Sequence, residues 1–552
     1  MDTLKPIKQQ TNSYKSYFFH TTNQTPKSWH RGLVTFIFVC LLFTSSGFDF
    51  AKITPAKINL TALDRYFEQA RKDWKIPGMA VAIVKDGKIM LAKGYGLKEY
   101  AKAGNVDENT LFAIASNTKA FTAATLAILV TEGKLNWDDK VRDYLPYFQL
   151  YNPYVSEEMT VRDLLCHRSG LGTFSGDLLW YETPYSTQEV IKRAKYLKPQ
   201  FGFRSGFGYS NLMFMAASEV VAAVSGKPWQ EFLKERIFIP LGMISSHTGT
   251  NQLKNYENVA TPHFLPSGEG AQIVKVPYTH SDTAAGAAAI NSNAIDMARW
   301  LIMLLNKGKI GDVQILSPTV IWEMWQAQNA LGVSENSKKY FPSTHFKNYG
   351  LGWSLYDYLG QKIVTHTGAL DGMISGVAMV PDINLGIVVL TNSMNSLPSA
   401  IINKIIDTYL GVPPTDWSKM SLERTKQFEE KEKLAEEALA KKEKEQKPLP
   451  QFQTNLEEYT GSYNDPMYGE ASITLENSAL ILNLLPAPVF ISDLTPRFYD
   501  TFNLTLRNKF SFIPKGTGTV QFFRDKDGKI THLKIDIPNY DFFFTEMEFQ
   551  KK

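Results

Sequence analysis

The stretch that most constrains this chain is residues 112–121, because it places a serine and a lysine three positions apart at the start of an apolar helix. Its centre reads Ser116-Asn-Thr-Lys119, and the sequence holds no other Ser-x-x-Lys. An apolar run, 111–115, leads into it, and a helix-like run, 119–131, follows it. Backbone N–H groups are unpaired at the first turn of a helix and the helix dipole is positive there, so negative charge at Ser116 is favoured.

Lys119 is expected on the same helical face as Ser116, one turn further on. The residues after it are mostly apolar or small, so this helix is expected to be buried on most sides. Desolvation of a buried lysine favours the neutral amine, which can accept the proton of the serine hydroxyl. An ordinary capped helix is the alternative, since serine and threonine are common N-caps. A lysine at the head of a buried helix favours the catalytic interpretation.

A tyrosine for proton transfer is offered by two Tyr-x-Asn triplets, at Tyr209-Ser-Asn211 and Tyr256-Glu-Asn258. The first follows a tight Gly-Phe-Gly loop and opens a helix-like run, 212–224, so its hydroxyl could reach Ser116 and Lys119. The ordinary pKa of tyrosine is about 10, so a tyrosinate base would need a neighbouring positive charge. Without the flanking glycines, a core aromatic side chain would be the better interpretation. We therefore select Tyr209 and Asn211.

A substrate-docking strand is suggested by His-Thr-Gly, which also occurs twice, at residues 247–249 and 366–368. The first copy lies in a loop-like region. The second ends an apolar run and precedes a predicted hairpin, so His366, Thr367 and Gly368 are expected on an edge strand. The glycine would let a substrate approach the backbone closely. The next N–H, that of Ala369, could pair with that of Ser116 as an oxyanion hole.

The composition excludes several other classes of protein. The 552 residues carry a net charge of +4 from 59 basic and 55 acidic side chains, without a long basic tract, so we expect no nucleic-acid partner. There is no zinc-ligand spacing and no glycine-rich phosphate loop, so we expect no metal and no cofactor. Of the two cysteines, Cys40 lies in the leader and Cys166 in the body, where a buried thiol is expected. His167 is expected to be a structural hydrogen-bonding histidine.

Residues 1–50 have the order of a secretory leader: a basic stretch, an apolar run at 33–43, then small residues at 44–47. The apolar run is short for a membrane span, so a signal peptide is the preferred interpretation and an N-terminal anchor is the alternative. The chain is accordingly expected to be exported, and to be periplasmic or membrane-associated.

The body of the chain predicts an α+β fold with helices packed on an antiparallel sheet. Residues 60–74 have helical periodicity, and the β-rich runs 79–84 and 88–92 are joined by Asp-Gly, a strong hairpin signal. Helical and loop segments fill 134–310, where a helical lobe would lie. A second hairpin at 376–390 and a helix at 400–410 close the body.

The C-terminal part changes character twice. Residues 421–447 alternate charges of both signs and predict a solvated helical linker, placed within 416–450. Residues 451–552 are rich in apolar and aromatic runs, which predict the strands of a small all-β barrel or sandwich. These runs are 479–485, 509–513, 519–524, 532–537 and 542–549.

Taken in order, Ser116-x-x-Lys119, Tyr209-x-Asn211 and His366-Thr-Gly368 resemble the penicillin-recognising serine hydrolases, specifically the class C β-lactamase-like family. That family includes D-alanyl-D-alanine carboxypeptidases, D-amino-acid peptidases and esterases. The resemblance covers residues 60–410 and implies a sheet lobe and a helical lobe with the active site between them. The domains are then expected at 51–415 for the hydrolase and at 451–552 for a β domain. The stretch 459–463 makes that second domain resemble the lipocalin-like domain of some such peptidases, where it is associated with covering the active site and with homo-oligomers.

The resemblance implies that Ser116 is the nucleophile, that Lys119 and Tyr209 activate it, and that Asn211 holds the substrate amide. It also implies that His366 and Thr367 line the docking strand. True class C β-lactamases carry lysine at the position of His366, so the triplet is more similar to the carboxypeptidase and peptidase members.

We therefore expect an exported serine hydrolase that acts through an acyl-enzyme on a D-amino-acid-containing peptide or a small ester. The alternatives are a catalytically silent penicillin-binding or sensor protein and a class C β-lactamase. A peptide, an ester or a β-lactam is the expected small-molecule partner. A terminal carboxylate on the substrate would require a docking cation, which the sequence does not identify.

Overall fold

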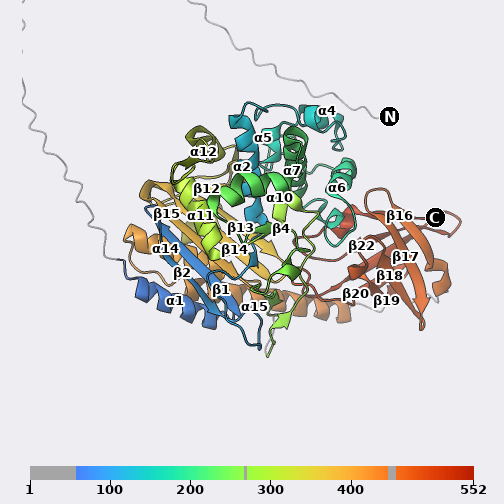
Figure 1. Cartoon of the computed structure of the whole chain (residues 1–552). Helices are drawn as coiled ribbons and strands as arrows, with labels where there is room; N and C mark the ends of the chain where they lie inside the picture. The colour runs from blue at the N-terminus through green and yellow to red at the C-terminus, as the bar shows by residue number, and fades with distance from the viewer. Residues whose placement is uncertain (1–57, 267–269, 446–454) are drawn as a thin grey trace, which may run out of the picture. The chain divides into compact units, whose positions relative to one another are not determined.

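The computed structural model describes residues 58–266, 270–445 and 455–552 (Figure 1). The leader expected at 1–50 lies outside these residues. Within the described ranges, no helix combines the length and the apolar composition needed to cross a membrane.

The described body is built on an antiparallel sheet of eight strands in the order β10-β11-β12-β13-β14-β15-β1-β2. The first strand in sequence, β1, pairs with the last, β15, from Met79 opposite Thr391 to Lys85 opposite Leu385. The two ends of the body are thereby joined inside the sheet, beside its edge strand β2. The strands are β1 Gly78–Lys85, β2 Lys88–Gly96, β10 Asn329–Leu331, β11 Lys347–Tyr349, β12 Ser354–Tyr358, β13 Gln361–Leu370, β14 Met373–Val380 and β15 Leu385–Thr391.

Both predicted hairpins are present. The β1–β2 turn is made by Asp86 and Gly87, whose φ angles are 51° and 73°. Two positive φ values in a two-residue turn match the right-handed twist of the strands, which explains the Asp-Gly signal. The β14–β15 hairpin turns through Asn384 at φ 48°.

Helices cover both faces of the sheet (Figure 1). Val81 and Ile83 of β1 pack with α1 Leu60–Asp73 and α14 Leu397–Leu410 in one buried cluster. Alternate residues of the same strand, such as Ala82, belong to a second buried cluster, which includes α11 Ala294–Leu305. Successive side chains of a strand point to opposite faces, so β1 is apolar from residue 78 to residue 84 because both of its faces are buried there.

The helical lobe surrounds α2 Thr118–Thr131, twelve of whose fourteen residues are buried. Its closest partners are α7 Asn211–Ser225 and α10 Ala285–Ala288. The other helices of this part are α3 Val141–Tyr144, α4 Pro153–Glu158, α5 Val161–Leu164, α6 Thr187–Arg193, α8 Trp229–Leu233, α9 Ile239–Leu241, α12 Pro318–Met324 and α13 Glu335–Tyr340. Short strands also occur, in sheets β3-β7-β4 (Phe112–Ala113, Ile290–Ser292, His247–Thr248), β5-β6 (His263–Phe264, Val274–Lys275) and β8-β9 (Lys309–Ile310, Val313–Gln314).

The charge-rich segment after α14 is helical over α15 Trp417–Glu445. The C-terminal part is a closed eight-stranded barrel in which β16 pairs with β23, as Tyr463 lies opposite Lys551. Aromatic side chains such as Tyr459, Phe502 and Phe522 are buried and in mutual contact, consistent with a small barrel filled by side chains. The strands are β16 Gly461–Asp465, β17 Gly469–Glu476, β18 Ala479–Leu484, β19 Ser492–Phe498, β20 Thr501–Leu506, β21 Thr517–Arg524, β22 Ile530–Asp536 and β23 Glu548–Lys551.

Two of the strand predictions in the barrel are wrong. Residues 509–513 contain no strand, and 542–547 are loop and 3-10 turn, with β23 beginning only at Glu548. Their aromatic side chains are buried between the barrel, where Phe510 and Phe544 pack on Phe490, and the hydrolase part. The ring of Tyr181 lies 4.6 Å from that of Phe542 and 6.4 Å from that of Phe510.

We expect Trp300 to be a main support of α2. Its ring stacks on Phe121 at 4.1 Å and is fully buried. Replacing it with alanine should lower the free energy of unfolding by about 3–5 kcal/mol, as for other buried aromatic residues. Chemical denaturation followed by circular dichroism measures this.

Trp322→Ala on α12 is the matched control, because that side chain is 62 % exposed. This variant should lower the free energy of unfolding by less than about 1 kcal/mol. Equal losses for the two variants would contradict the packing of α2 described above.

Candidate active site

Ser116 lies in a sharp turn between β3 and α2. The chain leaves β3, passes through Ala115 at φ 49° and enters a 3-10 turn, Ala115–Asn117, before α2 begins. A positive φ is costly for alanine, and such backbone persists only where the surroundings enforce it. The turn leaves Ser116 half-buried between fully buried neighbours, so its hydroxyl is accessible.

Neighbouring strands hold this turn in place. The hydroxyl of Ser375 on β14 donates to the carbonyl of Ile114 at 2.6 Å and accepts from Asn117 Nδ2 at 2.8 Å. The N–H of Ile290 on β7 donates to Thr118 Oγ1 at 3.1 Å. The two polar residues between the serine and the lysine therefore anchor the turn and do not cap the helix.

Lys119 is fully buried, and its Nζ lies within hydrogen-bond distance of three oxygen atoms. These are Asn211 Oδ1 at 2.6 Å, the Ala287 carbonyl at 3.0 Å and Ser116 Oγ at 3.0 Å. The first two can only accept hydrogen bonds. A neutral amine has two N–H groups, so donating to both leaves its lone pair for the Ser116 hydroxyl. This contact set suits a base that removes the serine proton.

Burial lowers the pKa of Lys119 to about 7, against the partly opposing effect of the nearby Asp177 carboxylate. The neutral amine is therefore abundant at neutral pH, as the sequence led us to expect for a buried lysine.

Asn211 and Asp177 continue the polar network away from Lys119. Asn211 Nδ2 donates to Asp177 Oδ2 at 2.6 Å while its Oδ1 accepts from Lys119. Because a carboxylate accepts and the lysine donates, this pair of contacts fixes which way the amide points. Burial raises the pKa of Asp177 to about 7. The expected substrate-holding residue Asn211 thus has its carbonyl occupied within the protein and only an N–H left over.

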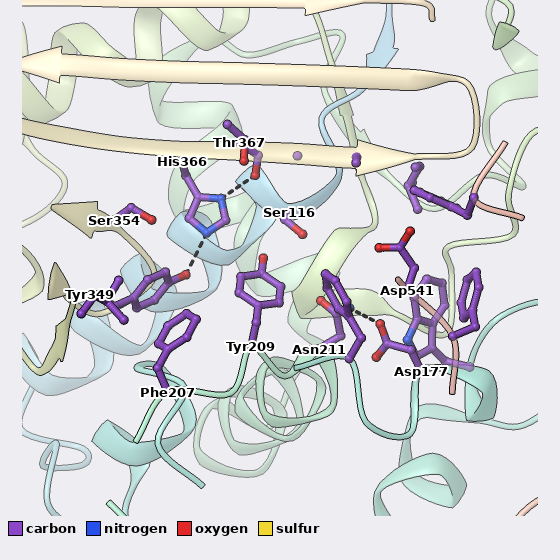
Figure 2. Close-up of a pocket in the computed structure, with 18 residues that line it drawn as sticks. Ser116, Asp177, Phe207, Tyr209, Asn211, Tyr349, Ser354, His366, Thr367 and Asp541 are labelled. Carbon is purple, nitrogen blue, oxygen red and sulfur yellow. Dashed lines mark hydrogen bonds between the residues drawn. The ribbon is translucent and has the colours of Figure 1, made fainter. Parts of the chain in front are cut away.

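Tyr209 precedes α7, and its hydroxyl points toward Ser116 (Figure 2). Desolvation raises its pKa well above 10, opposed by the interaction with Ser116. Lys119 Nζ lies 4.7 Å from the ring centre. These values favour a neutral phenol that relays protons over a tyrosinate base, and Lys119 as the base.

His167 supports the tyrosine loop. It is fully buried, its Nδ1 accepts from the N–H of Ser210 at 3.0 Å, and its ring lies 4.1 Å from that of Tyr209. Burial holds its pKa well below the usual range, so it stays neutral. These contacts fit the structural histidine that the sequence suggested.

His366 has both ring nitrogens engaged within the protein. Its Nδ1 donates to the Thr367 carbonyl at 2.6 Å, and its Nε2 accepts from the Tyr349 hydroxyl at 2.8 Å. Burial lowers its pKa to about 3. It lines the cavity as a neutral ring and offers no positive charge to a substrate.

The strand that carries Thr367, Gly368 and Ala369 differs from the expected edge strand, since β13 lies between β12 and β14. Pairing with β12 stops at Thr365, however, so residues 366–370 pair on the β14 side alone. This half of the strand retains one open edge, and Thr367 and Ala369 are exposed there.

Glycine is required at position 368 for a different reason than the one predicted. A Cβ at this position would overlap the carbonyl oxygen of Ile114 and lie 2.9 Å from the backbone nitrogen of Ser116. The glycine lets β13 approach the Ser116 turn, whereas we had expected it to admit substrate. The close approach brings the adjacent Ala369 into the neighbourhood of the Ser116 N–H.

These side chains line one cavity of about 260 Å³ (Figure 2). All eight residues selected from the sequence belong to this region: Ser116, Tyr209, Asn211, His366, Thr367, Gly368 and Ala369 line the cavity, and Lys119 lies directly beneath Ser116. None of the 18 described residues of the lining is lysine or arginine. Elsewhere in the described part of the chain, no three His, Cys, Asp or Glu side chains are grouped as a metal site.

The rejected triplets lie together outside this cavity. The ring of His247 stacks on that of Tyr256 at 4.4 Å, and neither residue lines the cavity. Cys166 is a buried free thiol, and burial raises its pKa to about 12.

Sequence reasoning missed several residues that build the cavity, among them Asp177, Tyr349 and Asp541. None of these has a local spacing that marks it, because each reaches the cavity through the tertiary fold. Asp541 and the neighbouring Phe512 and Phe542 come from loops of the barrel.

A family model described as beta-lactamase matches residues 63–408, and one described as a domain of unknown function matches 444–551. An unguisins hydrolase of Aspergillus campestris is 30 % identical over 439 residues, which are 76 % of this chain and 79 % of the relative. The flp protein of Staphylococcus aureus strain N315 is 26 % identical over 62 % of this chain and 64 % of its own length.

Two solved structures share the fold. The octameric penicillin-binding protein homologue of Pyrococcus abyssi is 21 % identical, with a TM-score of 0.58 over 90 % of this chain and all of its own. A D-stereospecific amidohydrolase of Streptomyces sp. is 22 % identical, with a TM-score of 0.51 over 64 % of this chain and all of its own.

The reactivity of Ser116 should follow the protonation of Lys119. Covalent labelling by a fluorophosphonate should accelerate as pH rises through about 7, because the lysine loses its proton there. Asp177→Asn should move this rise to lower pH, because the carboxylate that raises the pKa of Lys119 is removed. The amide oxygen of the new side chain can still accept the hydrogen bond from Asn211. The measurement is the labelling rate against pH by intact mass.

Asp312→Asn, an exposed change in the β8–β9 turn, is the control and should leave the profile unchanged. A midpoint near the ordinary lysine value, or no shift in Asp177→Asn, would contradict this description of the base.

Proposed function

Because the chain belongs to the β-lactamase family of serine hydrolases, we propose that it is an exported enzyme that hydrolyses a D-amino-acid-containing peptide or a small ester through an acyl-enzyme on Ser116. The observation that carries the proposal is the contact set of Lys119, which is buried and directs one lone pair at the Ser116 hydroxyl.

In the first step neutral Lys119 takes the hydroxyl proton while Ser116 Oγ forms a bond to the substrate carbonyl carbon. The carbonyl oxygen becomes negative and receives hydrogen bonds from the backbone N–H groups of Ser116 and Ala369. The close approach of β13 at Gly368 supports this placement. The positive end of α2 also favours negative charge at this point.

In the second step the tetrahedral intermediate expels the amine or alcohol and leaves an ester on Ser116. The neutral hydroxyl of Tyr209, which points toward Ser116, protonates the leaving group, and the proton held by the Lys119 ammonium replaces the one that the tyrosine gives up. Water then attacks the ester, Lys119 or Tyr209 accepts its proton, and Ser116 is regenerated with release of the acid.

The cavity lining disfavours substrates that must present a carboxylate. A carboxypeptidase or a β-lactamase needs a cation for that group. The described lining supplies none, and both ring nitrogens of His366 are occupied. A D-peptidase, amidase or esterase fits this cavity better.

A catalytically silent binding protein is disfavoured by the completeness of the site. Ser116, Lys119 and Tyr209 are all present and mutually adjacent, and Asn211 is held by Asp177. Maintaining a lysine at 0 % exposure is costly unless it has a task. The order of basic, apolar and small residues in 1–47 supports the export part of the proposal.

Replacement of the nucleophile tests the proposal. Ser116→Ala should lower kcat/KM for p-nitrophenyl acetate about a thousandfold or more, to the background left by the rest of the site. Ser399→Ala removes an exposed serine hydroxyl on α14 and should leave the rate unchanged. Equal activity of Ser116→Ala and the wild type would refute the assignment of the nucleophile.

A further inference from the structure

The loop 173–177 places two groups of the candidate active site. It ends at Asp177, and its first two residues pair with the backbone of Tyr209. The N–H of Phe174 donates to the Tyr209 carbonyl at 2.7 Å, and the Tyr209 N–H donates to Thr173 Oγ1 at 3.1 Å. The positions of the tyrosine and of the aspartate around the base therefore depend on this one loop.

The backbone of the loop is strained. Phe174 has a φ angle of 61° and Gly176 one of 79°. A positive φ is costly for a bulky residue such as phenylalanine, and it persists only where the surroundings enforce it. The conformation of the loop therefore requires contacts from elsewhere in the fold.

The barrel supplies two such contacts through Glu546, the last residue of a 3-10 turn that begins at Phe544. Glu546 Oε1 accepts from the Ser175 hydroxyl at 2.5 Å, and Oε2 accepts from the Gly176 N–H at 2.8 Å. Ser175 is only 1 % exposed, so this contact is shielded from water. Both oxygens of one carboxylate thus hold the two residues in the middle of the loop.

The Glu546 carboxylate is held by these two hydrogen bonds without a cation. None of the described lysine, arginine or histidine side chains forms an ion pair with it, and burial raises its pKa despite both contacts. A largely buried carboxylate without a cation costs free energy. Its neighbours Phe544 and Met547 are each 1 % exposed and anchor the turn in the barrel. The fold therefore keeps an unfavourable charge aimed at the loop.

Other contacts hold the barrel against the hydrolase part, so Glu546 is not needed for docking alone. Ser511 donates to Asp371 Oδ1 from its N–H at 3.0 Å and from its hydroxyl at 2.5 Å. Arg193 Nη1 donates to the carbonyl of Met467 at 2.7 Å. A change at Glu546 leaves these contacts in place.

We propose that Glu546 is a positioning residue for the hydrolase, which acts from the barrel by fixing the loop 173–177. It thereby keeps Tyr209 and Asp177 aligned with Lys119. This inference rests on the proposed function, because it assumes that these groups activate the nucleophile. The reactivity of the serine then depends on the barrel even for a substrate with a very small acyl group.

The test compares kcat/KM for p-nitrophenyl acetate among variants of the full chain. Glu546→Ala should lower it about tenfold or more, because small displacements of catalytic groups are costly. Glu546→Gln should restore most of the rate. Its amide oxygen can accept from the Gly176 N–H, and its NH2 group can donate to Ser175 Oγ, since a hydroxyl both donates and accepts. Glu457→Ala, an exposed change on the barrel, is the control and should leave the rate unchanged.

Ser175→Ala removes one of the two contacts from the hydrolase side. It should lower kcat/KM about threefold in the wild type and have little effect in Glu546→Ala, where the contact is already missing. Circular dichroism checks that each variant is folded. If Glu546→Ala does not fold, the single variant Ser175→Ala decides, and a wild-type rate would then overturn the positioning role.

The possible results separate the two proposals. Ester hydrolysis that does not depend on Ser116 would overturn the proposed function. Hydrolysis that depends on Ser116, with a wild-type rate in folded Glu546→Ala, would overturn the positioning role alone. A loss that Glu546→Gln does not restore, or losses that add in the double variant with Ser175→Ala, would also contradict it. In either case the rate would not depend on the hydrogen bonds to the loop.

Discussion

The site depends on one unfavourable burial, that of the Lys119 amine under the first turn of α2. Removing a lysine from water favours its neutral form, and the three oxygens around Nζ arrange that form so that it faces Ser116. Those oxygens come from α7, α10 and the Ser116 turn, so all three must meet for the amine to be satisfied. The apolar character of α2 follows from the same requirement, because a solvated helix would return the lysine to its ordinary pKa.

The elements with local signals could be predicted from the sequence. The Asp86-Gly87 hairpin, the helix after Ser116 and the helix at 400–410 are present, because turn chemistry and apolar periodicity act over a few residues. Ser116, Lys119 and Tyr209 could be selected as candidates because each belongs to a short motif, and the structure brings them together. Asp177 and Asp541 were not found, because a single aspartate has no spacing and reaches the cavity only through tertiary contacts.

The errors have a common physical cause. The apolar runs at 509–513 and 542–549 predict strands from their composition, but only the end of the second run is a strand, which begins at Glu548. Their aromatic side chains pack both on Phe490 of the barrel and on Tyr181 of the hydrolase part. Gly368 was expected to admit substrate but admits the Ser116 turn. A sequence shows that a residue will be buried or closely approached, and the partner is decided by the fold.

The most direct test of the central claim is the intact mass of the protein when p-nitrophenyl acetate turnover is quenched in acid, followed by peptide mapping. If Lys119 activates Ser116 as described, a single acetyl group will be found on Ser116 in the wild type and will be missing in Ser116→Ala. A single acetyl group on another residue, or steady turnover with no covalent intermediate on a protein that retains Ser116, would contradict the account.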